Sequence, residues 1–101
     1  MKCDFCGINI GPSDKYSAYP VPDYTIGKIA EGLTLRSTGN AWAACDICSH
    51  YVDREMWYSL KQRAIIREML TTPEWFHDQI PAIIQEAHDG FISHYKKGQK
   101  I

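Results

Sequence analysis

The chain lacks an excess of charge of either sign and has no long apolar run. Its 101 residues include 11 Lys and Arg against 12 Asp and Glu, which gives a formal net charge of −1. This balance disfavours non-specific nucleic-acid binding, which depends on an excess of positive charge. No apolar run approaches the ~20 residues of a membrane-spanning helix, and Met1 leads into no apolar signal-peptide core. We therefore expect one compact domain in the cytoplasm, without membrane association.

The sequence also lacks the motifs of the common enzyme classes. It contains no P-loop, no GxGxxG, no GxSxG turn, and neither the HxE nor the HExxH pattern of catalytic zinc sites. No two histidines are four residues apart, so no helix carries a two-histidine metal face. A treble-clef nuclease would need histidines on the hairpin before the finger helix, and residues 7–44 contain no histidine. We expect a protein without enzymatic activity. Three of its histidines are then expected to be surface or boundary residues: His77, His88 and His94.

The four cysteines form two pairs of equal spacing, Cys3-Asp4-Phe5-Cys6 and Cys45-Asp46-Ile47-Cys48. In a reducing cytosol, paired thiols more often bind metal than form lasting disulfides. Two CxxC turns can supply a tetrahedral set of four sulfurs for zinc. The 38 residues between the pairs exceed the ~15–20 of compact zinc motifs, so the insert has to fold back on itself. We expect one structural Zn²⁺, held by Cys3, Cys6, Cys45 and Cys48.

Several alternatives compete with this assignment. A redox dithiol would follow a strand in a βαβ pattern, which neither pair does. A rubredoxin-like iron site would be expected to carry glycine after both pairs, whereas Gly7 follows Cys6 but Ser49 follows Cys48. A third alternative is a set of four buried thiols without metal. His50, two residues after Cys48, could also replace one thiolate as a ligand.

The residues that follow each pair indicate a treble-clef zinc finger. Gly7 tolerates the positive φ of a knuckle. After Cys48 the chain continues through Ser49 to Trp57 without glycine or proline, which is typical of a helix. Such a helix would direct its positive N-terminal dipole at the thiolates. The expected fold class is α+β, with a treble-clef-like region (knuckle, β-hairpin, helix) over residues 1–52 and a helical region over residues 53–101 packed on it.

Short motifs beyond the cysteine pairs extend this pattern to residue 64. They are CDFCG at the N-terminus, Tyr19-Pro20, the WAACDIC segment at residues 42–48, and downstream Trp57, Leu60 and Arg63. Together they resemble small, functionally uncharacterised zinc-finger proteins of bacteria and their phages. The resemblance implies four zinc ligands, at Cys3, Cys6, Cys45 and Cys48, and implies no reaction.

Two strand predictions concern the insert between the cysteine pairs. Residues 16–26 are rich in aromatic and β-branched residues, but Pro20 and Pro22 restrict them to an edge strand or a broken one. Residues 33–37 and 41–44 flank the turn sequence Ser37-Thr38-Gly39-Asn40. We expect these two segments to pair as a hairpin that delivers Cys45 to the metal.

Two helical segments are predicted after the second pair. The first runs from Asp53, the expected N-cap, to Leu70, and its two apolar stripes predict cover from both the zinc half and the C-terminal segment. The second starts at Thr72-Pro73-Glu74 with Thr72 as the hydroxyl cap, and Pro81 predicts a short first helix or a kink. Apolar residues then recur at helical spacing to Tyr95, which fits an internal core or a homodimer contact.

Two functions follow from these observations. The first is a zinc-stabilised protein-interaction module, such as a small regulator or a phage-encoded effector that acts on a host protein. Exposed Trp75 or Tyr24 and part of the C-terminal stripe would make the contact. The alternative is a nucleic-acid-binding finger, which the charge balance disfavours. Its candidate contacts are Lys28, Arg36, Arg54 and Lys61, with Lys96, Lys97 and Lys100 in support.

Overall fold

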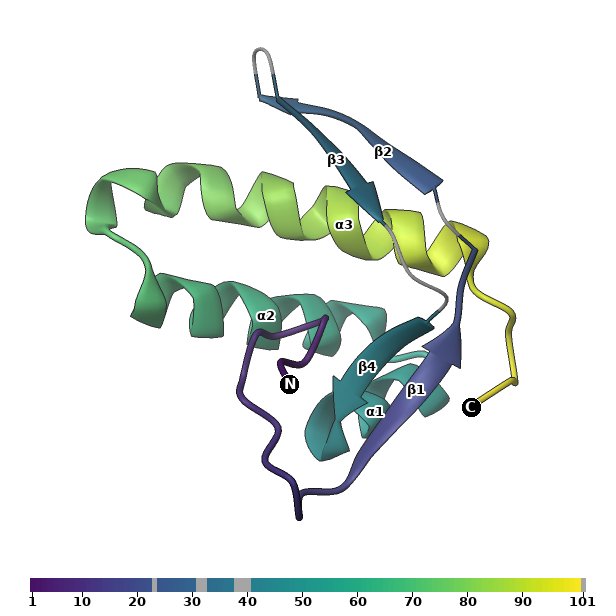
Figure 1. Ribbon diagram of the computed structural model, residues 1–101. Helices are drawn as coiled ribbons and strands as arrows, with labels where there is room; N and C mark the ends of the chain where they lie inside the picture. Colours follow the sequence, from purple (N-terminus) through teal and green to yellow (C-terminus); the bar gives the residue numbers. More distant parts are fainter. Residues whose placement is uncertain (23, 31–32, 38–40, 101) are drawn as a thin grey trace.

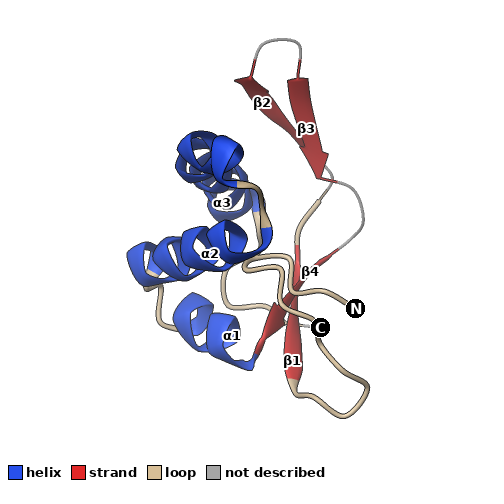
Figure 2. Ribbon diagram, turned by 90° about the vertical axis from the view of Figure 1, so that its left-hand side faces the viewer, coloured by secondary structure: helices blue, strands red, loops and turns tan. Residues whose placement is uncertain are grey.

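The computed structural model describes residues 1–22, 24–30, 33–37 and 41–100. For residues 24–30 and 33–37 it describes the backbone alone. The strands are β1 (Tyr16–Pro20), β2 (Tyr24–Ala30), β3 (Leu33–Ser37) and β4 (Ala41–Cys45). The helices are α1 (Asp46–Asp53), α2 (Trp57–Thr71), the 3₁₀ helix η1 (Glu74–Gln79) and α3 (Ile80–His94). The three α-helices lie on one side of the molecule and the strands on the other (Figures 1 and 2). The predicted α+β fold is confirmed, including the order knuckle, hairpin, helix.

The strands form two separate antiparallel sheets, β1 with β4 and β2 with β3. The predicted hairpin of residues 33–37 with 41–44 is therefore wrong, and residues 38–40 of its turn lie outside the described chain. Instead, β4 pairs with β1, with Trp42 opposite Tyr19 and Cys45 opposite Tyr16. This pairing places the buried rings of Tyr19 and Trp42 on the same face, and burial of that face outweighs the proximity of β3 in sequence.

The β2–β3 hairpin is thus an insertion between the two partners β1 and β4, and it extends over α3 in Figure 1. The prolines account for the division. Strand β1 ends at Pro20 and β2 begins at Tyr24, because proline cannot donate a ladder hydrogen bond. The predicted broken strand over residues 16–26 is confirmed.

The first predicted helix is two helices joined by a tight corner. Helix α1 ends at Asp53 and α2 begins at Trp57, so the assignment of Asp53 as an N-cap is wrong. At the corner, Glu55 adopts a positive φ of 55°, and the N–H of Met56 donates to the carbonyl of Tyr51 at 2.8 Å. The Asp53 carboxylate is engaged elsewhere: it accepts hydrogen bonds from Tyr19 and Lys100.

The C-terminal segment contains the predicted short helix followed by a longer one. Helix η1 covers Glu74–Gln79, and α3 then carries Pro81 in its first turn, where the missing N–H costs no hydrogen bond. The predicted hydroxyl cap is wrong, because the Thr72 hydroxyl donates backwards to the carbonyl of Glu68 at 2.7 Å. None of the helices in the described ranges is long and apolar enough to cross a membrane.

The core joins the cysteine knuckle to α3 through the ring of Phe5. This ring lies edge-on to those of Trp42, His88 and Phe91, with centroid distances of 5.0, 5.6 and 4.8 Å. Leu60 of α2 is buried in the same cluster. On the apolar stripe of α3, Ile80, Ile84 and Phe91 are buried, which confirms the internal-core interpretation for these residues and shows the C-terminal helix packed on the finger.

Tyr19 fastens β1 to α1 through its hydroxyl group. The ring is buried, and the hydroxyl donates to Asp53 Oδ1 at 2.8 Å and lies 2.8 Å from Ser49 Oγ. Burial and the neighbouring Asp53 carboxylate raise the pKa of Tyr19 to about 12. The hydroxyl therefore stays protonated and remains a donor throughout the neutral pH range.

Replacement of this hydroxyl tests its contribution to stability. We predict that Tyr19→Phe lowers the free energy of unfolding by about 1–2 kcal/mol, because a buried hydrogen bond to a carboxylate is lost. Tyr16→Phe, on the same strand but 49% exposed, is the matched control and should change stability by less than about 0.5 kcal/mol. Urea unfolding curves of the two variants measure the difference; equal stabilities would contradict the role given to Tyr19.

Candidate metal centre

The first cysteine pair lies in a knuckle closed by backbone hydrogen bonds. The N–H of Gly7 donates to the carbonyl of Cys3, and the N–H of Cys3 donates to the carbonyl of Ile8, both at 2.9 Å. Gly7 has a φ of +77°, as predicted for this position. A Cβ at Gly7 would also approach Glu68 Oε1 to 3.0 Å. The positive φ therefore favours glycine here, and a larger residue would in addition displace the carboxylate end of the Glu68 side chain.

The second pair spans the junction of β4 and α1. Cys45 is the last residue of β4, and Cys48 lies in the first turn of α1, so the predicted helix start at this pair is confirmed. Asp4 fixes β4 against the knuckle: its N–H donates to the carbonyl of Ala43 at 2.8 Å, and its carboxylate accepts from the N–H of Ala43 at 2.6 Å. In addition, the N–H of Cys45 donates to Cys3 Sγ at 3.4 Å.

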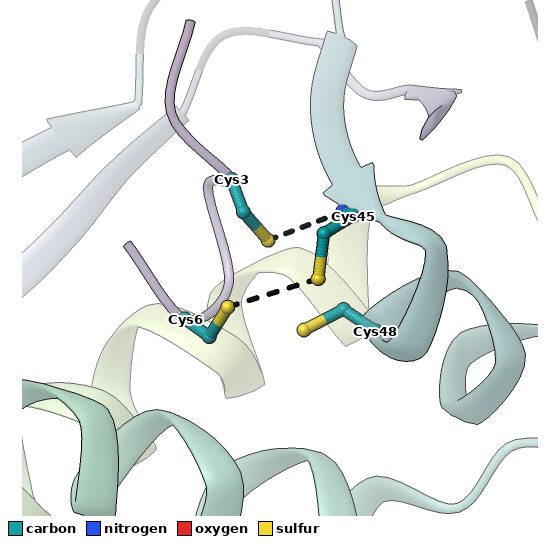
Figure 3. A group of neighbouring side chains, drawn as sticks. All are labelled: Cys3, Cys6, Cys45 and Cys48. Atoms are coloured by element: carbon teal, nitrogen blue, oxygen red, sulfur yellow. Dashed lines mark hydrogen bonds between the residues drawn. The ribbon is translucent and has the colours of Figure 1, made fainter. Parts of the chain in front are cut away.

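These contacts bring all four sulfurs into one cluster (Figure 3). The sulfurs lie within 4.8 Å of one another, and the Sγ atoms of Cys6 and Cys45 are 3.8 Å apart. A tetrahedral site with Zn–S bonds of ~2.3 Å requires S···S distances of about 3.8 Å. Cys3, Cys6 and Cys48 are buried and Cys45 is half-buried. The cluster can hold one metal ion, and its chemistry and spacing are consistent with zinc.

The ionisation of the thiols shows why the cluster suits a divalent cation. Hydrogen bonds from Cys3 and Cys48 lower the pKa of Cys6 to about 3. Hydrogen bonds with Cys3 and Cys6, together with burial, raise the pKa of Cys48. One thiol thus ionises readily at the expense of its neighbour, since like charges at this distance disfavour each other. Four thiolates can coexist here only when a cation sits among them.

Arg63 of α2 supplies a positive charge beside the sulfurs. Its Nη2 lies 3.8 Å from Cys45 Sγ. Burial alone would lower the pKa of Arg63, but hydrogen bonds to Cys45 and Cys48 raise it overall. Arg63 belongs to the downstream motif of the sequence, but its position beside the sulfurs was not predicted. The available signal was its position one helical turn after Leu60, which extends the finger-facing side of α2.

Among the histidines, His88 is the one whose predicted location is wrong. It is 1% exposed, and its Nε2 lies 3.1 Å from the carbonyl of Phe5, between the two knuckle cysteines. Because a carbonyl only accepts, Nε2 carries the proton and Nδ1 is the bare nitrogen, without a hydrogen-bond partner in the described residues. The signal for burial was in the sequence, since His88 follows Ile84 by four residues and precedes Phe91 by three.

His50 does not join the metal cluster formed by the described residues. It is exposed, and its Nδ1 lies 2.6 Å from the guanidinium of Arg54. The four sulfurs form the cluster without it. His94 is exposed at the end of α3 and His77 is half-buried in η1, as expected for surface or boundary positions.

The candidate nucleic-acid contacts are distributed over different elements. Lys61 pairs with Asp89 of α3 at 2.5 Å, and Arg54 lies at the α1–α2 corner. Lys28 and Arg36 are residues of β2 and β3, whose side chains lie outside the description. In the supporting tail, Lys97 pairs with Glu55 at 2.7 Å and Lys100 with Asp53 at 2.6 Å, while Lys96 is exposed. Two of the three tail lysines are thus paired within the chain.

The proposed protein contacts are placed only in part. Trp75 is 77% exposed, as predicted, whereas Tyr24 is a residue of β2 without a described side chain.

Removal of the Arg63 charge should weaken metal binding. We predict that Arg63→Met lowers the affinity for Zn²⁺ by about tenfold or more, because outer groups that touch metal ligands typically have effects of this size. Competition with a chromophoric chelator measures the affinity. The control is Arg67→Met on the same helix, which has no hydrogen bond to a cysteine in the described chain. An Arg63→Met protein that binds zinc as tightly as this control would contradict the assignment.

The buried imidazole predicts a pH dependence of stability. Burial lowers the pKa of His88 below its ordinary 6.5, with Lys61 acting in the same direction and Phe5, Cys3 and Asp89 opposing. Below about pH 6.5 the His88 side chain is therefore protonated in the unfolded chain but still largely neutral in the folded one, until the pH reaches the lower folded pKa. Stability should fall as the pH drops from about 6.5 towards the folded pKa, by up to ~1.4 kcal/mol per pH unit.

His88→Gln separates this effect from proton uptake by the cysteines, which both proteins share. The glutamine amide can still donate to Phe5 but does not titrate in this range. We expect the variant to lose less stability than the wild type between pH 7 and pH 5 when both are unfolded with denaturant at equal zinc concentration. Identical pH profiles would show that His88 is protonated equally in both states.

Comparison with known protein families, curated proteins and solved structures gives no match to this chain. The resemblance to small zinc-finger proteins is therefore supported only by the four-cysteine cluster itself. The assignment of a metal site rests on the geometry of the four cysteines.

Proposed function

We propose that this protein is a zinc-stabilised, non-enzymatic protein-interaction module of the cytoplasm. The observation that carries the proposal is the convergence of four cysteine sulfurs at tetrahedral spacing. Four protein ligands complete the coordination of Zn²⁺ and leave no position for a substrate, which is the arrangement of structural zinc sites. Catalytic zinc sites keep one position open.

Zinc is favoured over the alternatives by the surroundings of the cluster. Residue Ser49, which follows Cys48, continues α1, so the second pair does not form the glycine-bearing turn that the rubredoxin-like alternative requires. A redox dithiol would need two cysteines that pair with each other, whereas here the Cys45 sulfur lies 3.8 Å from Cys6 of the other pair and all four sulfurs belong to one cluster. Free cysteines suit a reducing compartment.

Binding of the zinc ion would stabilise the folded state of the whole domain. Phe5 lies between two of the ligands, and its ring contacts the buried rings of α3 and β4. Binding free energies of about 10–16 kcal/mol have been found for structural zinc in small fingers, which exceeds or equals the usual stability of a domain of this size. We infer that metal binding and folding are coupled.

An interaction role is supported by the surface and by the charge. Large apolar side chains remain exposed on α2 and η1, among them Tyr58, Leu70 and Trp75. Four thiolates add four negative charges and Zn²⁺ adds two positive ones, so the formal charge of −1 becomes −3. The resemblance to small phage and bacterial fingers extends the proposal to a small regulator that acts on a host protein.

A capture experiment in the source cell tests this function against the nucleic-acid alternative. Tagged, zinc-loaded protein is isolated with its partners over a series of salt concentrations, with and without nuclease. We expect a protein partner that survives both treatments, because apolar interfaces depend little on salt. Capture of nucleic acid alone, lost steeply with rising salt as counterion release demands, would contradict the proposal.

A further inference from the structure

The outward face of α2 carries a stripe of exposed apolar side chains. Tyr58, Ile66 and Leu70 are 77%, 57% and 73% exposed. Their spacing of eight and four residues puts them on one side of the helix, opposite buried Leu60 and Ala64. A large apolar side chain on a surface is common singly, but a row along one helix face marks a contact surface.

A hollow beside this stripe joins α2 to α1. It is an open, shallow depression of about 400 Å³. Its lining consists of Tyr51 of α1 and of Tyr58, Ser59, Gln62, Arg63, Ile66 and Arg67 of α2. Helices α1 and α2 lie next to each other on the helical side of the molecule (Figure 2). A groove between two helices with aromatic walls is a shape that accepts one face of an amphipathic helix.

The charges around this hollow are all positive. Arg63 and Arg67 line it, and no carboxylate does. Within the described residues Arg67 has no ion pair, and Arg63 is turned to Cys45 with one of its nitrogens. The nearby acid on the same helix, Glu68, points instead to the knuckle at Gly7. Because the Arg63 charge faces the sulfurs, Arg67 is the charge that this apolar surface offers to a partner, in a molecule whose net charge is negative.

We propose that this surface, formed by Tyr51, Tyr58, Ile66, Arg67 and Leu70, binds an acidic amphipathic segment of a partner protein. The apolar row would receive the partner's apolar side chains, and Arg67 its carboxylates, since complementary charge fixes orientation and speeds association. The inference rests on the proposed function and names the chemistry of the partner.

The same observations argue against two other occupants. A second copy of this face would bring arginine against arginine across a two-fold axis, because a symmetric contact repeats the same patch on both sides. Nucleic acid could pair with the arginines. It would, however, place polar phosphates and sugars against the apolar side chains of Ile66 and Leu70, which are more than half exposed and would gain no apolar contact.

A peptide selection tests the proposal with a defined probe. A random peptide library displayed on phage is selected against the folded, zinc-loaded protein, and the enriched peptides are synthesised and measured by fluorescence anisotropy. We expect enriched peptides with Asp or Glu beside apolar residues at helical spacing. Arg67→Glu and Ile66→Ser should each weaken their binding by about tenfold or more.

Lys96→Glu is the matched control for the charge reversal, because Lys96 is exposed on the tail and absent from the hollow. Its binding should stay within about twofold of wild type. Thermal unfolding verifies that each variant is folded. Peptides without acidic residues, or acidic peptides that bind the Arg67→Glu and Ile66→Ser variants unchanged, would overturn the proposal.

Failure of this inference is separable from failure of the proposed function. A protein partner captured from the cell that still binds the Arg67→Glu and Ile66→Ser variants would place the contact on another surface, while the interaction role would stand. Capture of nucleic acid alone would instead overturn the proposed function itself. The proposal of an acidic protein segment on this surface would then fall with it.

Discussion

The structure depends on a balance of charge among four sulfur atoms. The chain folds so that sulfurs from both ends of a long insert lie within 4.8 Å of one another, a distance at which thiolates repel unless a cation lies between them. Contacts within the protein itself position the sulfurs. They are the positive φ of Gly7, the Asp4–Ala43 hydrogen bonds and the start of α1 at the second cysteine pair. Arg63 adds a second positive charge from α2.

The cluster is connected to the rest of the domain by aromatic and polar contacts. Phe5, between two ligands, contacts rings of β4 and α3, and His88 of α3 is bonded to the Phe5 carbonyl. Tyr19 joins β1 to α1 through Asp53, and Asp53 also binds Lys100 of the tail. Burial raises the pKa of Asp53, but hydrogen bonds from Lys100 and Tyr19 outweigh it and lower the pKa overall. We therefore expect the finger and the helices to unfold together.

Local patterns in the sequence predicted the cysteine turns, the knuckle glycine and the break at Pro20, because each depends on residues a few positions apart. The pairing of β4 with β1 and the ends of α1 and α2 depend on distant partners: Trp42 packs with Tyr19, and Asp53 binds Tyr19 instead of capping a helix. Helical spacing indicated that His88 is buried and that Arg63 faces the finger. Their contacts with the Phe5 carbonyl and with Cys45 form only when α3 and α2 pack on the finger, so no local pattern could assign these contacts.

The metal content of the protein tests the account most directly. The protein is purified under reducing conditions, its zinc and iron are quantified per chain, and its thiols are titrated before and after chelation. The account predicts one zinc per chain, thiols that are protected until the metal is removed, and loss of the folded state with the metal. A folded protein without metal, whose four thiols react at once, would contradict it.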